Sequence, residues 1–254
     1  MPDGQILPAN NAPIVKMVRH ELKRRHLTVQ AHSYVTPNMI RITLTGEDLA
    51  DFTSLAPDDH VKLFVEGPDG TAMRDYTPRS YWAESQELVL DFAVHDAGPA
   101  TAWALQAKRG DSVDIGGPRA SRIITGDIAC WVLIGDETAL PAIARRMEES
   151  PAGTRIHAII SVPTEADKQV ITSAADAGIT WLVREASPAH TDILLDHVRT
   201  IDIPARSFIW IAAEGGETRT LRAHLLEERG HPKQWMKASG YWVRGKPDTT
   251  EKFD

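Results

Sequence analysis

The most distinctive chemistry-bearing stretch of the chain is RDYT, residues 74–77. In an extended chain Arg74 and Tyr76 point to one face, and Asp75 and Thr77 point to the other. A guanidinium can bind two phosphate oxygens at once, and a tyrosine ring can pack against a flat heteroaromatic group. The same four residues also fit the rim of a β-barrel with Tyr76 as half-buried filler. Taken alone, the stretch favours this structural interpretation.

A second stretch, HDAGPATAWA (95–104), predicts a strand that leads into a helix with small residues in its first turn. Gly98, Pro99 and Ala100 would leave the N–H groups of that turn accessible, and Thr101 adds a hydroxyl donor. The helix dipole favours an anion at this end. An arginine on a strand shortly before such a helix start therefore indicates a diphosphate site, although this stretch alone is also compatible with a plain helix start.

A third stretch, GDETALP (135–141), joins an apolar run to a helix but lacks the glycine spacing of a dinucleotide-binding turn. Its acidic residues, Asp136 and Glu137, would repel a phosphate but tolerate a ring edge or a ribose hydroxyl. The chain contains no HExxH, no GxSxG, no Walker motif and no Cys/His cluster with zinc spacing. We therefore expect no metal held by protein ligands, and we expect the ten histidines to be structural or exposed.

The elements that carry these stretches are of two kinds. In the first half, short alternating or β-branched strands are separated by turns and interrupted by one helix at 98–110; the strands are expected at 26–36, 38–46, 60–67 and 87–95. In the second half, apolar strands alternate with helices; the strands are expected at 130–136, 155–162, 179–184, 207–216 and 239–245, and the helices at 138–150, 191–200 and 217–230. The first pattern predicts an antiparallel β-barrel, and the second a Rossmann-like α/β domain with a parallel sheet covered on both faces.

The pattern changes near residues 123–127, so we expect one domain at 16–125 and a second at 126–254. Residues 1–15 lack the basic and apolar regions of a signal peptide and are expected to be a disordered lead-in. The polar tail 246–254 is expected to be mobile.

The composition limits the classes of function. A formal net charge of −7 argues against a nucleic-acid surface, because such domains usually carry a basic excess. The one cysteine, Cys130, excludes an internal disulfide and fits a reducing compartment. No apolar run is long enough to span a bilayer. These features predict a cytoplasmic protein with neither a nucleic-acid nor a membrane partner.

Five stretches, taken in this order, resemble the siderophore-interacting proteins, which are FAD-dependent ferric-siderophore reductases of the ferredoxin-reductase-like superfamily. The stretches are RDYT (74–77), HDAGPATAWA (95–104), GDSVDIGGPRAS (110–121), GDETALPAI (135–143) and GYWVRG (240–245). The resemblance runs from about His20 to Gly245. It implies a flavin domain followed by a nicotinamide domain, with electrons supplied by NAD(P)H.

The resemblance also implies which residues bind the cofactors. Arg74 would hold the FAD diphosphate, while Tyr76 and Thr77 would contact the isoalloxazine ring. The turn around the same diphosphate would be formed by His95, Gly98, Ala100 and Thr101. Thr138 and Ala139 would lie near the flavin ring, where the nicotinamide approaches. Tyr241 and Trp242 match the aromatic pair found near the carboxy terminus of the family. Trp103 and this pair are also compatible with a role in packing.

The substrate implied by the resemblance is an iron(III) ion already wrapped in oxygen donors and often carrying negative charge. Such a substrate needs positive charge near the flavin edge instead of protein metal ligands, and the matching residues are Lys62, Arg119 and Lys237. Each of the three is also compatible with a solvated surface charge. No side chain is expected to act as an acid or base, so we assign no catalytic residue. Ala120 and Ala213 depart from the glycines usual in the family at these positions.

Three interpretations follow. The first is a ferric-siderophore reductase in which NAD(P)H reduces FAD and FAD reduces the iron. The second keeps the FAD but takes electrons from a ferredoxin. The third is a siderophore- or nucleotide-binding protein that has kept the fold and lost turnover; the presence of Arg74, Tyr76 and Thr77 weighs against it, because a protein that only binds does not need them.

Overall fold

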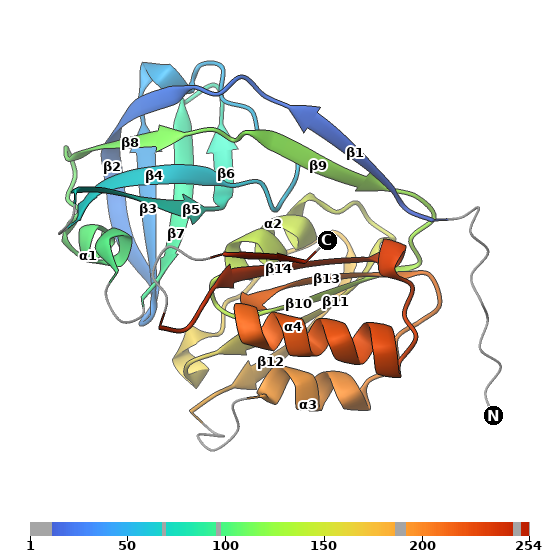
Figure 1. Cartoon of the computed structure of the whole chain (residues 1–254). Coiled ribbons are helices and arrows are strands. Elements are labelled where there is room, and N and C mark those ends of the chain that lie inside the picture. The colour runs from blue at the N-terminus through green and yellow to red at the C-terminus, as the bar shows by residue number, and fades with distance from the viewer. Residues whose placement is uncertain (1–11, 68–69, 95–97, 186–191, 246–249, 254) are drawn as a thin grey trace, which may run out of the picture.

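The computed structural model describes residues 12–67, 70–94, 98–185, 192–245 and 250–253. Its strands form a curled seven-stranded sheet, a six-stranded sheet with helices, and a two-stranded ribbon (Figure 1). The curled sheet and its helix come from the first half of the chain, and the six-stranded sheet comes from the second half. This confirms the expectation of a β-rich unit followed by an α/β unit.

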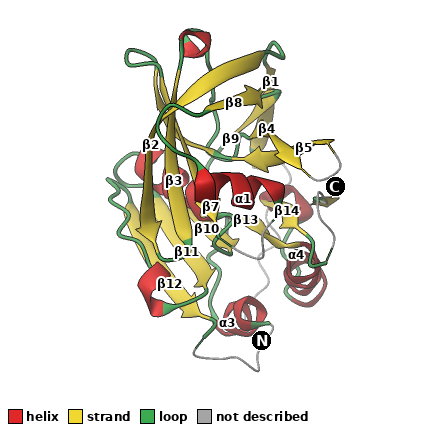
Figure 2. Cartoon of the chain, turned by 90° about the vertical axis from the view of Figure 1, so that its left-hand side faces the viewer, coloured by secondary structure: helices red, strands yellow, loops and turns green. Residues whose placement is uncertain are grey.

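The curled sheet is antiparallel, in the order β5-β4-β8-β2-β3-β7-β6. Its strands are β2 (Arg24–Thr36), β3 (Met39–Thr45), β4 (Val61–Gly67), β5 (Gly70–Tyr76), β6 (Pro78–Trp82), β7 (Glu87–Ala93) and β8 (Ser112–Gly116). Apolar residues on its concave side form a core that includes Leu63, Leu90 and Ile115, each fully buried. The helix α1 (Pro99–Gln106) packs beside this sheet (Figure 2).

The curled sheet is open. The predicted barrel therefore had the right curvature, but the sheet does not close on itself. The two edge strands, β5 and β6, are consecutive in the chain, yet no ladder joins them among the described residues. Only Thr77 separates them, and β6 begins at Pro78, which has no N–H to donate to a ladder. The chain therefore turns a corner at Thr77 between the two edges.

The second sheet has the order β12-β11-β10-β13-β14-β15. Its strands are β10 (Cys130–Gly135), β11 (Arg155–Val162), β12 (Asp176–Val183), β13 (Ser207–Glu214), β14 (Met236–Trp242) and β15 (Glu251–Phe253). The first five strands run parallel. One face packs on α2 (Leu140–Glu149), and the other packs on α3 (Ile193–Thr200) and α4 (Gly215–Ala223), which continues as a π-helical turn over His224–Glu228. Helices on both faces confirm the doubly wound pattern.

The C-terminal strand β15 corrects two expectations. It pairs antiparallel with β14, so the sheet is mixed, and residues 251–253 of the tail are ordered although we predicted a mobile tail. Two contacts hold the strand: Phe253 packs into the core beneath α4, and the carboxylate of Glu251 accepts hydrogen bonds from Arg219 at 2.6 Å. Three residues are too few to display a strand period, so the sequence pattern did not reveal them.

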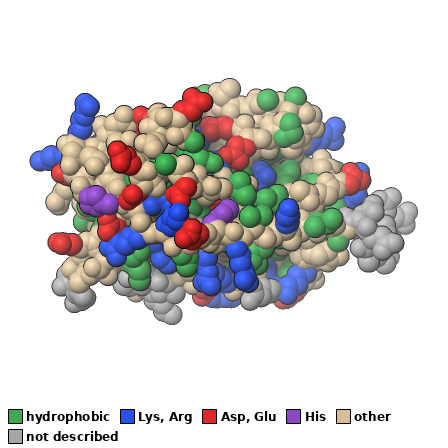
Figure 3. Space-filling model, turned by 90° about the horizontal axis from the view of Figure 1, so that it is seen from above, with side chains coloured by type: hydrophobic (Ala, Val, Ile, Leu, Met, Phe, Trp, Pro, Cys, Tyr) green, Lys and Arg blue, Asp and Glu red, His purple; other side chains and the backbone are tan. Residues whose placement is uncertain are grey.

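A two-stranded ribbon lies across the top of the molecule in Figure 1, formed by β1 (Ile14–Arg19) and β9 (Ala120–Thr125). Its first strand begins at Ile14, inside the segment we expected to be disordered up to residue 15. Seen from above, this face shows Lys and Arg side chains interspersed with acidic and apolar ones (Figure 3). No large field of a single charge sign covers it.

Helix α2 lies between the two sheets and joins the two units (Figure 1). Arg145, on this helix, is 4% exposed and crosses the junction. Its guanidinium donates to the hydroxyl of Ser54 at 2.7 Å, to the Ser54 carbonyl at 3.0 Å and to the Pro78 carbonyl at 3.1 Å. An ion pair between Arg79 and Glu148 adds two hydrogen bonds of 2.6 Å nearby. These contacts fix the Thr77 corner against the α/β unit.

Candidate active site

The predicted RDYT stretch forms the end of β5 and the corner that follows it. The Tyr76 ring packs on Phe92, with 4.3 Å between ring centroids, and Phe92 in turn packs on Trp103 of α1. Burial raises the pKa of the Tyr76 hydroxyl above its usual value, so this group remains neutral. Partial burial lowers the pKa of Arg74 below its usual value.

The start of α1 has the properties expected of an anion site. Its N-cap, Gly98, contributes no side-chain hydrogen bond, and the first turn carries no acidic residue. A side chain built on Gly98 would meet nothing within 4 Å, so no described atom crowds the N-cap position. Ala100 and Thr101 are buried in this turn, and His95 lies outside the described residues.

The helix start and the β4–β5 hairpin belong to one small region. A side chain built on Gly67, at the end of β4, would lie 3.3 Å from the Pro99 ring. Arg74 is on the adjacent strand β5, opposite Leu63 of β4. One unit thus contains a cation, a helix start without a side-chain cap, and a tyrosine ring. These groups fit the diphosphate and the ring of a flavin dinucleotide.

The carboxyl edge of the parallel sheet brings Thr138 and Trp242 together around one carboxylate. Asp136 accepts hydrogen bonds from the Thr138 N–H at 2.9 Å, from the Thr138 hydroxyl at 2.5 Å and from the Trp242 indole at 2.8 Å. Ala139 is fully buried, and its methyl group packs where Gly135 leaves room. Ala139 therefore contributes packing, and only its backbone is placed to serve a ligand.

Two carboxyl groups at this edge have raised pKa values. Burial, followed by the negative charge of Glu137, raises the pKa of Asp136 to about 6. Burial, followed by the charge of Asp136, raises the pKa of Glu217 to about 8. Glu137 itself is paired with Arg184 through hydrogen bonds of 2.6 and 2.7 Å. At neutral pH Asp136 is ionised while Glu217 keeps its proton, so it is chiefly the charge of Asp136 that disfavours phosphate at this edge, as the GDET stretch suggested.

Sequence reasoning missed Glu217. It lies in the first turn of α4, where an acidic residue is ordinary, and nothing local in the sequence connects it with Asp136. The connection follows from topology, because β13 pairs directly with β10 and their carboxyl ends meet. Parallel sheets that reverse strand order at such a point bind ligands there. A predicted strand order that placed β13 beside β10 would have brought Glu217, in the helix after β13, close to Asp136.

The three predicted basic residues, Lys62, Arg119 and Lys237, form what we call the basic cluster. Lys237 pairs with Asp58, and Lys62 lies opposite Gly116 in the sheet. The backbone N of Arg119 lies 3.1 Å, and the His60 carbonyl 3.7 Å, from a side chain built on Gly117. These contacts place the backbones of Lys62 and Arg119, and the aspartate partner of Lys237, along one segment, residues 58–62.

Tyr241 connects the basic cluster with the Thr77 corner. Its ring meets Trp210 edge to face at a centroid distance of 6.1 Å, and its hydroxyl shares a hydrogen bond with Thr77. Burial, followed by the negative charges of Asp58, Asp136 and Asp75, raises the pKa of Tyr241 well above its usual value. Tyr241 thus remains a neutral group between the two units.

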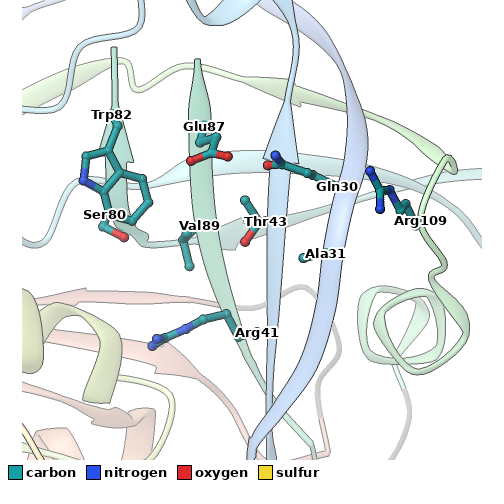
Figure 4. A pocket seen from close by; sticks show the side chains of 9 residues that line it. All are labelled: Gln30, Ala31, Arg41, Thr43, Ser80, Trp82, Glu87, Val89 and Arg109. Carbon is teal, nitrogen blue, oxygen red and sulfur yellow. The ribbon is translucent and has the colours of Figure 1, made fainter. Parts of the chain in front are cut away.

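Other hollows lie away from these residues. A cavity of about 460 Å³ opens on the convex face of the curled sheet, where Trp82 and Glu87 line one side and Gln30 and Arg109 the other (Figure 4). None of the predicted site residues lines it. Within the described ranges, no group of three or more His, Cys, Asp or Glu side chains could hold a metal ion.

Among the residues that the structure describes, no helix has the length and apolar character needed to cross a bilayer.

Comparison with known proteins identifies the family. Residues 129–245 match the family model described as siderophore-interacting protein, and residues 28–73 and 66–122 match the siderophore-interacting FAD-binding domain. The NADPH-dependent ferric-chelate reductase of Escherichia coli is 33% identical over 92% of this chain and 98% of its own length. The ferric vibriobactin reductase ViuB of Vibrio cholerae is 31% identical over 84% of this chain and 87% of its own.

A solved structure agrees with the sequence matches. The crystal structure of a siderophore utilization protein from T. fusca superposes with a TM-score of 0.84 at 35% identity, covering 95% of this chain and 98% of the other. The matches extend over both units and include the strand that carries Arg74 and the edge that carries Asp136 and Trp242. This chain is therefore a member of the siderophore-interacting protein family.

Proposed function

We propose that the chain is an FAD-dependent ferric-siderophore reductase that uses electrons from NAD(P)H to reduce siderophore-bound iron(III). The observation that carries the proposal is the combination, on one unit, of the Arg74–Tyr76 strand with a helix start that has a glycine N-cap and no acidic residue in its first turn. The relatives named ferric-chelate reductase and ferric vibriobactin reductase support this chemistry. Reduction releases the metal because iron(II) prefers hard oxygen donors far less than iron(III) does.

In this proposal, residues 16–125 bind FAD. Arg74 donates to the diphosphate together with the N–H groups of Ala100 and Thr101, and His95 and Gly98 complete the turn. Tyr76 and Thr77 contact the ring system. When bound, FAD supplies the conversion of a two-electron hydride donor into single-electron steps. The side chains bind and orient the reactants, and none is required as an acid or base.

Residues 126–254 receive NAD(P)H in the same proposal. Thr138, the backbone of Ala139, and Trp242 border the place where a nicotinamide would approach. The carboxyl groups of Asp136 and Glu217 suit the ribose and ring end of the donor better than its phosphates. The basic cluster would bind the ferric siderophore. We place the reaction in the cytoplasm, which is consistent with a single buried thiol at Cys130.

The test begins with the visible spectrum of the purified protein before and after anaerobic NADPH. A two-banded yellow spectrum that bleaches supports the whole route. Yellow protein that bleaches only with reduced ferredoxin would move the donor to ferredoxin. Colourless protein that takes up no added FAD would contradict the reductase proposal and leave a binding protein.

A pair of arginine variants tests the assignment within the flavin unit. Arg74→Ala should raise the Kd for FAD by on the order of tenfold or more, because a charged hydrogen bond to a diphosphate is lost. Arg109→Ala removes an exposed arginine just after α1 and should leave FAD binding unchanged. Equal effects of the two substitutions would remove Arg74 from the proposed site.

A further inference from the structure

The basic cluster carries less positive charge than its three cations suggest. Lys237 forms an ion pair with Asp58, and the Trp210 indole donates to the same carboxylate at 3.3 Å. The Lys62 ammonium lies 2.8 Å from Asp75. Arg119 is exposed and makes no ion pair with any described residue. Two of the three cations therefore each have a carboxylate as direct partner.

The Lys237–Asp58 pair is the more enclosed of the two. The exposed fractions are 21% for the Lys237 side chain and 9% for that of Asp58, so water screens their charges only partly. Burial alone would raise the pKa of Asp58, but the Lys237 charge and its hydrogen bond, with the charge of Arg146, lower it below its usual value. Asp58 therefore stays ionised at neutral pH and offsets the charge of Lys237.

Arg146, which lies outside the basic cluster, also acts on Asp58, and its charge helps to lower the pKa of that carboxyl. Its guanidinium lies over the face of the Trp131 ring, 4.3 Å from the centroid, and is directed at the ring of a neighbouring strand. Asp75 lies opposite Lys62 in the β4–β5 ladder, so the second pair is fixed by strand register. Both aspartates also raise the pKa of Tyr241, so both pairs lie near this side chain.

We propose that Asp58 and Asp75 determine substrate specificity: each offsets one cation of the basic cluster, so the site selects ferric chelates of low net charge over polyanionic ones. This inference rests on the proposed function, because it assumes that the basic cluster meets the ferric siderophore. A neutral trihydroxamate chelate of iron(III) meets a basic cluster in which, among the described residues, Arg119 alone has no carboxylate partner. A trianionic tris-catecholate meets the same cation together with two carboxylates.

The experiment measures binding of two ferric chelates to the oxidised, flavin-loaded protein, by quenching of tryptophan fluorescence without any reductant. One probe is a neutral hexadentate trihydroxamate and the other a trianionic hexadentate tris-catecholate. Asp58→Asn and Asp75→Asn should each lower the Kd of the trianionic chelate by on the order of tenfold. Neither should change the Kd of the neutral chelate more than about threefold.

Two further variants separate charge from folding. Lys237→Met should raise the Kd of the trianionic chelate, and the double variant Asp58→Asn/Lys237→Met should return it to within about threefold of the starting value. Asp75→Asn alters an exposed pair and keeps the test valid if Asp58→Asn fails to fold. Asp196→Asn, which breaks an exposed pair with Arg199 on α3, controls for the change in net charge alone.

The outcomes discriminate. Equal shifts for both chelates in Asp58→Asn and Asp75→Asn, or a shift as large in Asp196→Asn, would overturn the specificity role while leaving the reductase in place. An unchanged Kd of the trianionic chelate in Lys237→Met would do the same, because the pair would then lie outside the substrate's reach. If neither chelate binds the unaltered protein, the proposed function fails, and this inference fails with it.

Discussion

The carboxyl group of Glu217 is expected to weaken the folded protein at neutral and higher pH. Its pKa in the folded protein is about 8, against 4.5 for an ordinary glutamate. Below pH 4.5 both the folded and the unfolded chain hold the proton, and Glu217 costs nothing. Between pH 4.5 and 8 the unfolded chain has released the proton while the folded chain retains it, so stability falls as pH rises through this window.

The magnitude follows from the gap between the two pKa values. Each pKa unit corresponds to 1.36 kcal/mol, so the full gap gives about 5 kcal/mol. Partial contact of the Glu217 side chain with water reduces this cost to about 2 kcal/mol. Glu217→Gln keeps the shape and removes the charge. The variant should therefore be more stable than the parent by about 2 kcal/mol at pH 8.5 and equal to it at pH 5.

Urea unfolding at pH 5 and pH 8.5, followed by tryptophan fluorescence, measures this difference. Glu227→Gln is the matched control, since Glu227 is exposed on the turn that follows α4 and should change stability little at either pH. The reasoning is refuted if Glu217→Gln destabilises the protein at pH 8.5, or if its effect is the same at both pH values. In either case the carboxyl would be well solvated or stabilised by a partner.

Two further predictions concern how the protein is held together. Arg145→Met should destabilise the protein by about 3 kcal/mol in urea unfolding, because the buried carbonyls of Ser54 and Pro78 lose their donor. The control Arg199→Met, at an exposed position on α3, should cost less than about 0.5 kcal/mol. Similar losses of stability in both variants would contradict the role of Arg145 at the junction. Deletion of residues 250–254 removes β15 and should lower the Tm by several degrees; an unchanged Tm would show that the strand adds nothing to the sheet.

The parts of the fold that were predicted from sequence are those with a strong local pattern. The runs that became β10 and β11 are almost wholly apolar, and a run of this kind bounded by turn residues has few alternatives to a buried strand. Among the strands that were missed, β1 has mostly exposed residues and β15 has only three positions. Their pairing depends on partners elsewhere in the chain, which no local window contains.

The candidate site was predictable in its residue types but not in its pairings. Arg74, Tyr76 and Trp242 could be proposed because their neighbours in sequence resemble those of a known family. The bond between Lys237 and Asp58 joins residues 179 positions apart, and the contact of Tyr241 with Thr77 crosses between the two units. The net charge of the site depends on these long-range pairs. The sequence therefore predicted three cations, whereas in the fold two of them are paired with aspartates and only Arg119 has no carboxylate partner among the described residues.

The Arg145 contacts also have a consequence for motion. A hinge-like opening of the two units would break the three hydrogen bonds that the Arg145 guanidinium donates to the opposite unit. Such an opening would cost several kcal/mol, so the units are expected to move as one rigid body on the timescale of turnover. Any adjustment to a ligand at the junction would then come from side-chain rotations instead of a change in the angle between the two units.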